Sequence, residues 1–170
     1  MELYRGIAPW TLKQVQGDGK SKEHWTFMPR SDFKFSQIKR VRYAEIDAQA
    51  VVFNSRYLEY FDIGITEYWR AVGMYDGEQK HAEFHVARAE VDYKAPILLD
   101  EEIDICVRCS RIGRSSMTFL FELHGAGKDD LRATGVEVSV HVSEARGPST
   151  PVPDAVVAMF EAYEGQSLRG

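Results

Sequence analysis

The stretch YAEIDAQAVVFNSRYLEYFD, residues 43–62, combines a carboxylate with the start of a helical pattern. Asp47 sits in a short run of small and apolar residues, and Asn54 follows seven positions later, where the helical pattern begins. The first turn of a helix carries backbone N–H groups without an intrahelical acceptor, and such groups favour negative charge. The stretch therefore puts an acid and an anion-binding element close together in the chain.

One long amphipathic helix is predicted over residues 55–72. Its apolar residues recur at helical spacing and share one face: Tyr57, Leu58, Phe61, Ile65, Tyr68, Trp69 and Val72. Asn54 or Ser55 is the expected N-cap, and Gly73 the expected residue after the last turn. Gly64 costs about 1 kcal/mol relative to Ala inside a helix. We therefore expect Gly64 to lie against a neighbouring strand.

Strands are predicted on both sides of this helix. Residues 33–43 alternate apolar and polar, with a slip that predicts a bulge near Gln37. Further strands are expected over 84–97, 101–112, 115–125 and 131–143, followed by a short helix over 153–165. One long helix against an antiparallel sheet is an α+β layout. Because one helix cannot cover a broad sheet on both faces, the pattern also predicts a partner subunit.

The bulk composition excludes several classes of protein. A chain of 170 residues with 44% apolar and 28% charged residues is typical of one soluble domain. The net charge of −5 lacks the basic surplus of a nucleic-acid binder. No run approaches the length of a membrane span, and two cysteines favour a reducing, cytoplasmic setting. We expect an N-terminal extension over residues 1–31 that packs on the core, a domain over 32–165 and a tail over 166–170.

The order of elements and the motif around Asp47 resemble the hotdog-fold acyl-CoA thioesterases of the 4-hydroxybenzoyl-CoA thioesterase type. The spacing of that family motif is matched by Tyr43, Glu45, Asp47, Ala50, Val51, Val52, Phe53, Asn54 and Tyr57. Weaker matches are VDYKAPILLDEEI (91–103), RIGRSS (111–116) and PSTPVPDAVVAMF (148–160), so that the resemblance covers about residues 33–163. The family usually has Gly where this chain has Ala50. If that position needs positive φ, Ala50 is expected to shift the loop.

The resemblance implies thioester hydrolysis with Asp47 and Asn54 as catalytic residues. A backbone N–H near Asn54 would stabilise the negative charge that develops on the carbonyl oxygen, and the Asn54 side chain could position water or the carbonyl. Asp47 would act as a nucleophile or as a general base, and the sequence leaves both open. The structural alternatives are a turn residue for Asp47 and a plain N-cap for Asn54.

The resemblance also implies a substrate-binding set and an oligomer. The expected substrate-binding residues are Phe53, Tyr57, Asp62, Arg111, Arg114, Ser115 and Ser116. Asp62 falls where some relatives contact the distal end of the acyl group, and the two arginines suit coenzyme A phosphates. The alternatives are core packing for Tyr57 and solvated surface positions for Asp62 and the hairpin. The partners implied are an acyl-CoA substrate and further copies of the chain in a homodimer or homotetramer, with each site between subunits. No metal or redox cofactor is implied, and coenzyme A enters only as part of the substrate.

Other functions stay open at the level of sequence. A non-catalytic acyl-thioester binder with the same fold is the main alternative, and a purely structural protein is the least specific one. A hydratase usually pairs a His with an acid, and no His occurs between residues 25 and 80. Cys106 and Cys109 lack a second pair for zinc and are expected on opposite faces of a strand. HGAGKDD, residues 124–130, is expected to be a turn.

Overall fold

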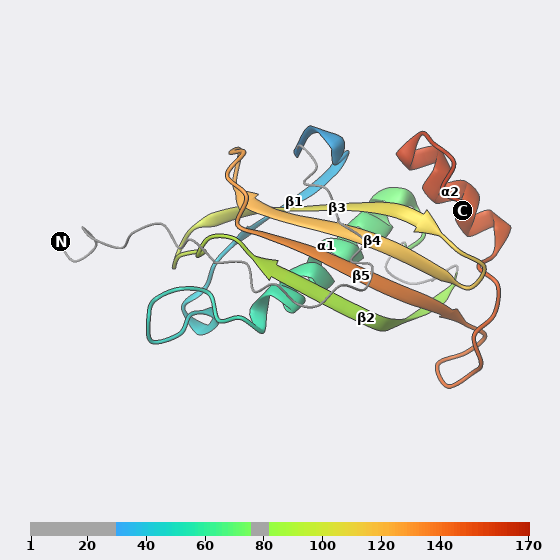
Figure 1. The fold of residues 1–170 in the computed structure, drawn as a ribbon, viewed down its shortest axis with the longest axis horizontal. Coiled ribbons are helices and arrows are strands. Elements are labelled where there is room, and N and C mark those ends of the chain that lie inside the picture. The colour runs from blue at the N-terminus through green and yellow to red at the C-terminus, as the bar shows by residue number, and fades with distance from the viewer. Residues whose placement is uncertain (1–29, 76–81) are drawn as a thin grey trace, which may run out of the picture.

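Five antiparallel strands form one sheet, and a long helix crosses one of its faces (Figure 1). The structure is a computed structural model that describes residues 30–75 and 82–170. Its elements in chain order are η1 (Arg30–Asp32), β1 (Phe35–Arg40), η2 (Tyr43–Glu45), α1 (Arg56–Val72), β2 (Glu83–Tyr93), β3 (Glu102–Ile112), β4 (Ser116–Gly125), β5 (Ala133–Val142) and α2 (Asp154–Glu164). The strand order is β1-β3-β4-β5-β2. The predicted α+β layout of a long helix against an antiparallel sheet is confirmed.

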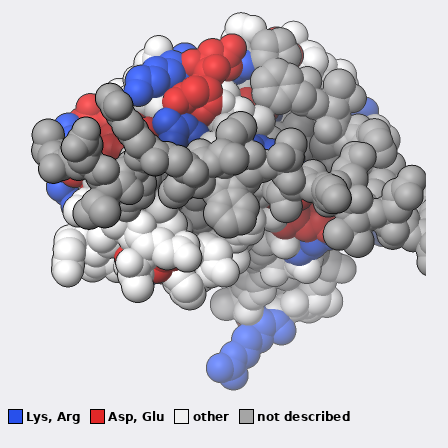
Figure 2. Space-filling view, turned by 60° about the vertical axis from the view of Figure 1, so that its left-hand side comes forward, with Lys and Arg blue, Asp and Glu red and all other residues white. Residues whose placement is uncertain are grey.

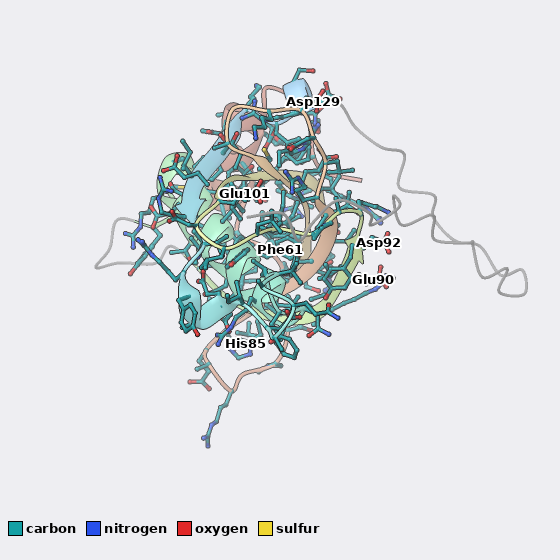
Figure 3. All side chains as sticks on the ribbon, turned by 90° about the vertical axis from the view of Figure 1, so that its left-hand side faces the viewer. Phe61, His85, Glu90, Asp92, Glu101 and Asp129 are labelled. Carbon is teal, nitrogen blue, oxygen red and sulfur yellow. The ribbon has the colours of Figure 1, made fainter. Side chains whose placement is uncertain are left out.

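The helix α1 packs tightly on the sheet because two glycines let backbones and rings approach closely. A Cβ at Gly64 would lie 2.5 Å from Cγ2 of Ile105, which confirms the predicted contact with a strand. A Cβ at Gly135 would lie 2.1 Å from the ring of Phe61, and that ring stacks on Phe121 at 4.4 Å between centroids. The helix ends where Gly73 adopts a φ of 87°, as predicted. Phe61 consequently lies in the middle of the molecule (Figure 3).

The first strand differs from the prediction in length and in regularity. β1 covers only residues 35–40, and its register with β3 runs from Phe35↔Val107 to Arg40↔Glu102 without a shift, so the predicted bulge is wrong. Ile38 does not slip into the core; it stays on the outer face and is 57% exposed. Tyr43 leaves the strand and begins the 3-10 turn η2. The bulges lie elsewhere, between Val86 and Arg88 and between Cys109 and Arg111.

Strand β5 presents its polar residues to the helix and its valines to the other face of the sheet. Gly135 and Glu137 pair with Phe121 and Phe119, both of which belong to the core under α1. By alternation Ser139 shares their face, whereas Val136 and Val138 face away. A sequence pattern of alternating valines would favour the opposite arrangement.

The second helix closes one end of the core through a buried polar contact. The hydroxyl of Tyr68 on α1 donates to the carboxylate of Glu164 at the end of α2, and the backbone N–H of Cys109 donates to the Tyr68 oxygen at 3.1 Å. Glu164 is 6% exposed. This contact ties α1, β3 and α2 together.

The two ends of the described chain, Arg30 and the tail after α2, both contact β3. Of the predicted extension over 1–31, residues 1–29 lie outside the described residues. Arg30 forms an ion pair with Asp104 of β3. In the tail, the carbonyl oxygen of Leu168 accepts from the N–H of Ile112 at 2.8 Å, so the tail adds to the edge of β3 near its end. Among the described helices, none is long and apolar enough to cross a bilayer.

Candidate active site

Asp47 lies at the closed end of a short hairpin that precedes α1. Its N–H donates to the carbonyl oxygen of Val51 at 2.9 Å, and its own carbonyl oxygen accepts from Ala50 at 3.0 Å. One carboxylate oxygen accepts from the N–H of Gln49 at 2.7 Å. A turn followed by one left-handed residue is a common three-residue hairpin loop. The carboxylate is half-buried, and no described residue donates to its second oxygen.

Ala50 occupies the left-handed position of this loop, with a φ of 59°. The position where the family usually has Gly therefore has a positive φ in this chain, which the sequence left open. The hydrogen bonds of Asp47 to Val51 and Ala50 are both formed around this residue. The alanine keeps the loop geometry at the cost of backbone strain, which is about 1–2 kcal/mol for a residue with a Cβ.

The start of α1 leaves backbone N–H groups without acceptors. The N–H of Arg56 donates to Phe53 at 2.9 Å and that of Tyr57 to Asn54 at 3.4 Å, both as tight turns. Ser55 stands at the N-cap position but makes no capping bond with its side chain. Within the described residues, neither the N–H groups of Asn54 and Ser55 nor the Asn54 side chain has a hydrogen-bond partner. The N–H groups of Asn54 and Ser55 are therefore free of acceptors in the described part of the chain, and a plain N-cap role for the Asn54 side chain is not seen.

The segment between the acid and the helix is fixed by the chain that follows β2. The N–H of Val52 donates to the carbonyl oxygen of Ile97 at 2.9 Å, and Val51 forms a bridge with Leu98. The hydroxyl of Tyr93 donates to the carbonyl oxygen of Asn54 at 3.1 Å. Tyr93 thus acts as a positioning residue that the sequence did not single out, although it lies in VDYKAPILLDEEI (91–103), one of the weaker matches to the family.

Tyr57 lies in the core rather than on the surface. It is 3% exposed, and its ring meets Tyr93 edge-on at 4.8 Å. Burial raises the pKa of Tyr57 to about 12, so its hydroxyl stays protonated. Its position favours the core-packing alternative over direct contact with substrate.

Glu45 anchors the other side of the hairpin. Burial acts to raise the pKa of Glu45, but hydrogen bonds from Lys39 at 2.6 Å, from the N–H of Arg42 at 2.7 Å and from Tyr60 at 3.2 Å outweigh it and lower that pKa. The carbonyl oxygen of Glu45 accepts from the N–H of Phe53 at 2.9 Å. Glu45 therefore holds the hairpin in place as a charged residue.

The hairpin pairing also sets the distance between the two predicted catalytic residues. Phe53 lies beside Glu45, so Asn54 follows the open end of the hairpin while Asp47 is at its closed end. Three steps along a strand place their Cα atoms on the order of 10 Å apart. A carboxylate and an N–H that both reach toward one small group would approach it from opposite sides.

Apolar side chains are exposed around this end of the molecule. They are Phe53, Leu58, Tyr93, Leu98 and Leu99, each between 42% and 49% exposed. Asp62 lies in α1 one turn after Leu58 and is also exposed. In the part of this end that is not grey in Figure 2, basic and acidic side chains lie next to each other. Lys39 and Arg40, part of a basic run in the sequence, are paired with Glu45, Asp100 and Glu102.

The predicted coenzyme A hairpin lies at the other end of the sheet. Arg111 lies at the end of β3, Arg114 and Ser115 lie in the turn that follows, and Ser116 begins β4. This hairpin lies next to α2, whereas the chain before α1 lies at the far end of α1 (Figure 1). Arg111 and Arg114 are exposed. Seventeen residues of α1 span about 25 Å. One protomer therefore does not bring Asp47 together with this hairpin.

Two motifs that resemble other kinds of site have structural roles here. In the 125–130 loop, the N–H groups of Gly125 and Gly127 donate to the carboxylates of Asp130 and Asp104, at 2.7 Å and 2.9 Å, so a phosphate would meet acids there. Cys106 and Cys109 are free, buried and on opposite faces of β3, as predicted, and burial raises the pKa of each thiol to about 12. The described residues contain no group of three His, Cys, Asp or Glu arranged to hold a metal ion.

Comparison with known proteins gives a consistent family. Residues 41–160 match the model of the Thioesterase-like superfamily. The chain is similar to a thioesterase of Thermus thermophilus solved with coenzyme A and Zn, with 29% identity, a TM-score of 0.72, and coverage of 81% of this chain and 98% of that one. The fold is shared with the PA5185 protein of Pseudomonas aeruginosa (24% identity, TM-score 0.72, 84% and 98% coverage) and with a thioesterase superfamily protein of Jannaschia (24%, 0.69, 79% and 85%). The match spans both the hairpin of Asp47 and the sheet under α1, and the chain belongs to the Thioesterase-like superfamily, with the hotdog fold.

Proposed function

We propose that this protein hydrolyses an acyl-CoA, or a similar acyl thioester, to a free acid and a thiol. The observation that carries the proposal is the arrangement before α1: a half-buried carboxylate in a closed hairpin, followed by backbone N–H groups without an acceptor in the described residues. Within the superfamily, an acid ahead of the helix favours the 4-hydroxybenzoyl-CoA thioesterase type. The coenzyme A held by the Thermus thermophilus thioesterase supports this class of substrate.

The proposed mechanism divides the reaction between the two ends of the hairpin. The N–H groups at Asn54 and Ser55 would donate to the carbonyl oxygen, where negative charge develops in the transition state. Asp47 would attack the carbonyl carbon directly or remove a proton from an attacking water, and its second oxygen is available for either step. Breaking the C–S bond then releases the coenzyme A thiolate, which takes up a proton. In the direct-attack route the acyl group is left as a mixed anhydride on Asp47, and a water molecule hydrolyses it to the free acid and the restored carboxylate. No step requires a metal or a redox cofactor.

The substrate would extend from this point in two directions. The acyl group would run over the exposed apolar residues Phe53 and Leu58 toward Asp62. Arg111, Arg114, Ser115 and Ser116 would bind the coenzyme A phosphates, but they lie at the opposite end of the protomer. We therefore propose a homodimer or a higher homo-oligomer of cytoplasmic location, in which the hairpin of a second copy completes each site.

The first test is the substitution Asp47→Asn. Asn keeps the turn hydrogen bond to Gln49 but can neither attack nor accept a proton, so turnover of acyl-CoA should fall on the order of 100-fold or more. Thiol release is followed with a chromogenic thiol reagent over a panel of aliphatic and aromatic acyl-CoAs. Asp92→Asn, an exposed acid of β2, is the matched control and should keep the wild-type rate.

Two outcomes would count against the proposal. Wild-type thiol release from Asp47→Asn would remove this residue from the mechanism. Tight binding of acyl-CoA by the wild-type protein, measured by calorimetry, without any thiol release would favour a non-catalytic acyl-thioester binder instead.

A further inference from the structure

Arg132, the residue before β5, binds both ends of the 94–101 loop, which follows β2. Its guanidinium donates to the carbonyl oxygen of Pro96 at 2.5 Å and to the carboxylate of Glu101 at 2.8 Å. Its own carbonyl oxygen accepts from the N–H of Lys94 at 2.8 Å. The side chains of Arg132 and Glu101 are only 16% and 17% exposed. One residue therefore fixes the start and the end of this loop.

Glu101 connects Arg132 with the hairpin that precedes α1. One carboxylate oxygen of Glu101 accepts from Arg132, and the other accepts from the N–H of Leu98 at 3.0 Å. Leu98 in turn forms the bridge with Val51, which lies inside the hairpin. The contacts therefore run without a gap from the guanidinium to the hairpin that bears the proposed catalytic acid, Asp47.

Two left-handed residues that are not glycine lie next to this bridge. Ala50, with a φ of 59°, directly precedes Val51, and Asp100, with a φ of 62°, follows Leu98 by two residues. In the part of the chain that the structure describes, no other residue with a Cβ has a positive φ. Such conformations persist where surrounding contacts over-determine the backbone, and they cluster at functional sites. Arg132 supplies part of this constraint on the side of the loop.

The charge of Arg132 also acts on the first turn of α1. Burial raises the pKa of Tyr57, and the positive charge of Arg132 opposes that shift, so the two side chains are near each other. The ring of Tyr57 meets that of Tyr93 edge-on, and the Tyr93 hydroxyl donates to the carbonyl oxygen of Asn54. Arg132 and Tyr93 therefore both act on the segment that begins α1.

We infer that Arg132 is a positioning residue for thioester hydrolysis: through Glu101 and the loop, it sets where the free N–H groups at the start of α1 lie relative to Asp47. The inference rests on the proposed function, and Arg132 itself touches neither substrate nor reacting atoms. A displacement of about 1 Å at a reaction centre can cost on the order of 100-fold in rate. Contacts elsewhere with the acyl group and coenzyme A would be unaffected, so the loss should appear in kcat rather than in KM.

The test is Arg132→Lys, because lysine keeps the charge that balances Glu101 and so protects the fold. Its single ammonium cannot reproduce the planar fork that reaches the Pro96 carbonyl and the carboxylate together. With the acyl-CoA of the panel that turns over fastest, kcat should fall on the order of 10-fold while KM stays within about 2-fold. The matched control is Arg88→Lys, whose arginine pairs with Glu90 on β2, away from Glu101 (Figure 3), and it should keep both constants.

A second variant covers the case in which Arg132→Lys does not fold. Glu101→Gln keeps an acceptor for the N–H of Leu98 but removes the charge that binds Arg132, so it should show the same loss in kcat. Wild-type kcat in either folded variant would overturn the positioning role. A rise in KM with unchanged kcat would also overturn it, because the residue would then serve only substrate binding.

A binding measurement separates this inference from the thioesterase proposal. If no acyl-CoA is hydrolysed, calorimetry compares octanoyl-CoA with the octyl-CoA thioether, which lacks the carbonyl oxygen. Wild-type protein should bind the thioester more tightly, because only the thioester can accept from the N–H groups at the start of α1. Arg132→Lys should lose this preference and bind the thioether as the wild type does. Absence of the preference in the wild type, or its full retention in Arg132→Lys, sinks the inference.

Discussion

At the scale of single residues, Ala50 adopts a left-handed backbone conformation that favours glycine, and the hairpin still forms. Its φ of 59° is one that glycine adopts at no steric cost, and the hairpin closes around it nonetheless. The strain is tolerated because the bonds of Asp47 on one side and the pairing of Val51 and Val52 with 97–98 on the other fix the backbone. The sequence identified the unusual position through the family spacing, but the left-handed conformation of the alanine depends on the hydrogen bonds around it and does not follow from residue type.

Ala50→Gly should stabilise the protein slightly. Relief of the left-handed strain stabilises the folded state by about 1–2 kcal/mol. The greater freedom of glycine stabilises the unfolded chain and offsets about 0.4–1 kcal/mol of this gain. We expect a net gain of about 0.5 kcal/mol in the free energy of unfolding, measured in urea, with unchanged position of Asp47. Ala48→Gly is the control in the same turn at an ordinary φ, and it should lose about 0.5–1 kcal/mol. Equal losses in both variants would contradict the strain assigned to Ala50.

Glu137 gives a prediction about pH at the same scale. Its folded-state pKa is raised, chiefly by burial, so the charged form is less favourable in the folded protein than in the unfolded chain. Below the unfolded-state pKa both states hold the proton and no penalty exists; the penalty grows as the pH rises through the folded-state pKa. Glu137→Gln should therefore raise stability at neutral pH, and its advantage should vanish in acid.

Urea denaturation across the range from about pH 4 to pH 8 measures this difference. The control Glu90→Gln changes an exposed acid, so its difference from wild type should stay small and nearly constant with pH. A Glu137→Gln variant that is less stable than wild type at neutral pH would show that the charged form has a stabilising partner.

At the scale of elements, α1 is the part of the fold that the sequence predicts best. Its helical period, its end at Gly73 and the contact of Gly64 all follow from residue spacing, because a single buried face imposes a strict pattern. The strands are harder. β5 alternates cleanly, yet Glu137 and Ser139 take the helix side while the valines take the other, and alternation alone cannot say which set faces α1. The bulge predicted in β1 is wrong because Ile38 is apolar but exposed, so its residue type does not show which face of the strand it occupies.

Gly64→Ala tests the closeness of α1 and β3. Helix propensity alone would stabilise the variant by about 1 kcal/mol. A Cβ 2.5 Å from Ile105 and 3.0 Å from Val107 must displace buried methyl groups, and overpacking of this kind costs about 1–3 kcal/mol. We expect a net loss of about 1 kcal/mol in urea denaturation. Ala71→Gly, at an exposed position of the same helix, measures the contribution of helix propensity separately. If Gly64→Ala gained as much stability as Ala71→Gly loses, packing against β3 would play no part.

At the scale of the whole molecule, the two groups of candidate site residues lie at opposite ends of one protomer. Asp47 and Asn54 precede α1, and the hairpin with Arg111 and Arg114 follows β3 at the other end of the sheet (Figure 1). The sequence predicted both groups through the family resemblance, but spacing along the chain carries no information on which end of a sheet each group occupies. Under the proposed function, a coenzyme A bound to both groups would therefore contact two copies of the chain.

This arrangement predicts that two inactive variants restore each other. Asp47→Asn removes the acid, and the double variant Arg111→Ala, Arg114→Ala removes the proposed phosphate contacts, so each homo-oligomer should be impaired at low substrate concentration. In a mixed dimer, one site receives Asp47 from the arginine variant and both arginines from the Asp47 variant, while the other site carries both defects. Mixed dimers purified through two different affinity tags should then regain about half of the wild-type kcat/KM per dimer. If acid and arginines served the same site from one protomer, no site in the mixed dimer would be intact, and thiol release would stay at the level of the impaired parents.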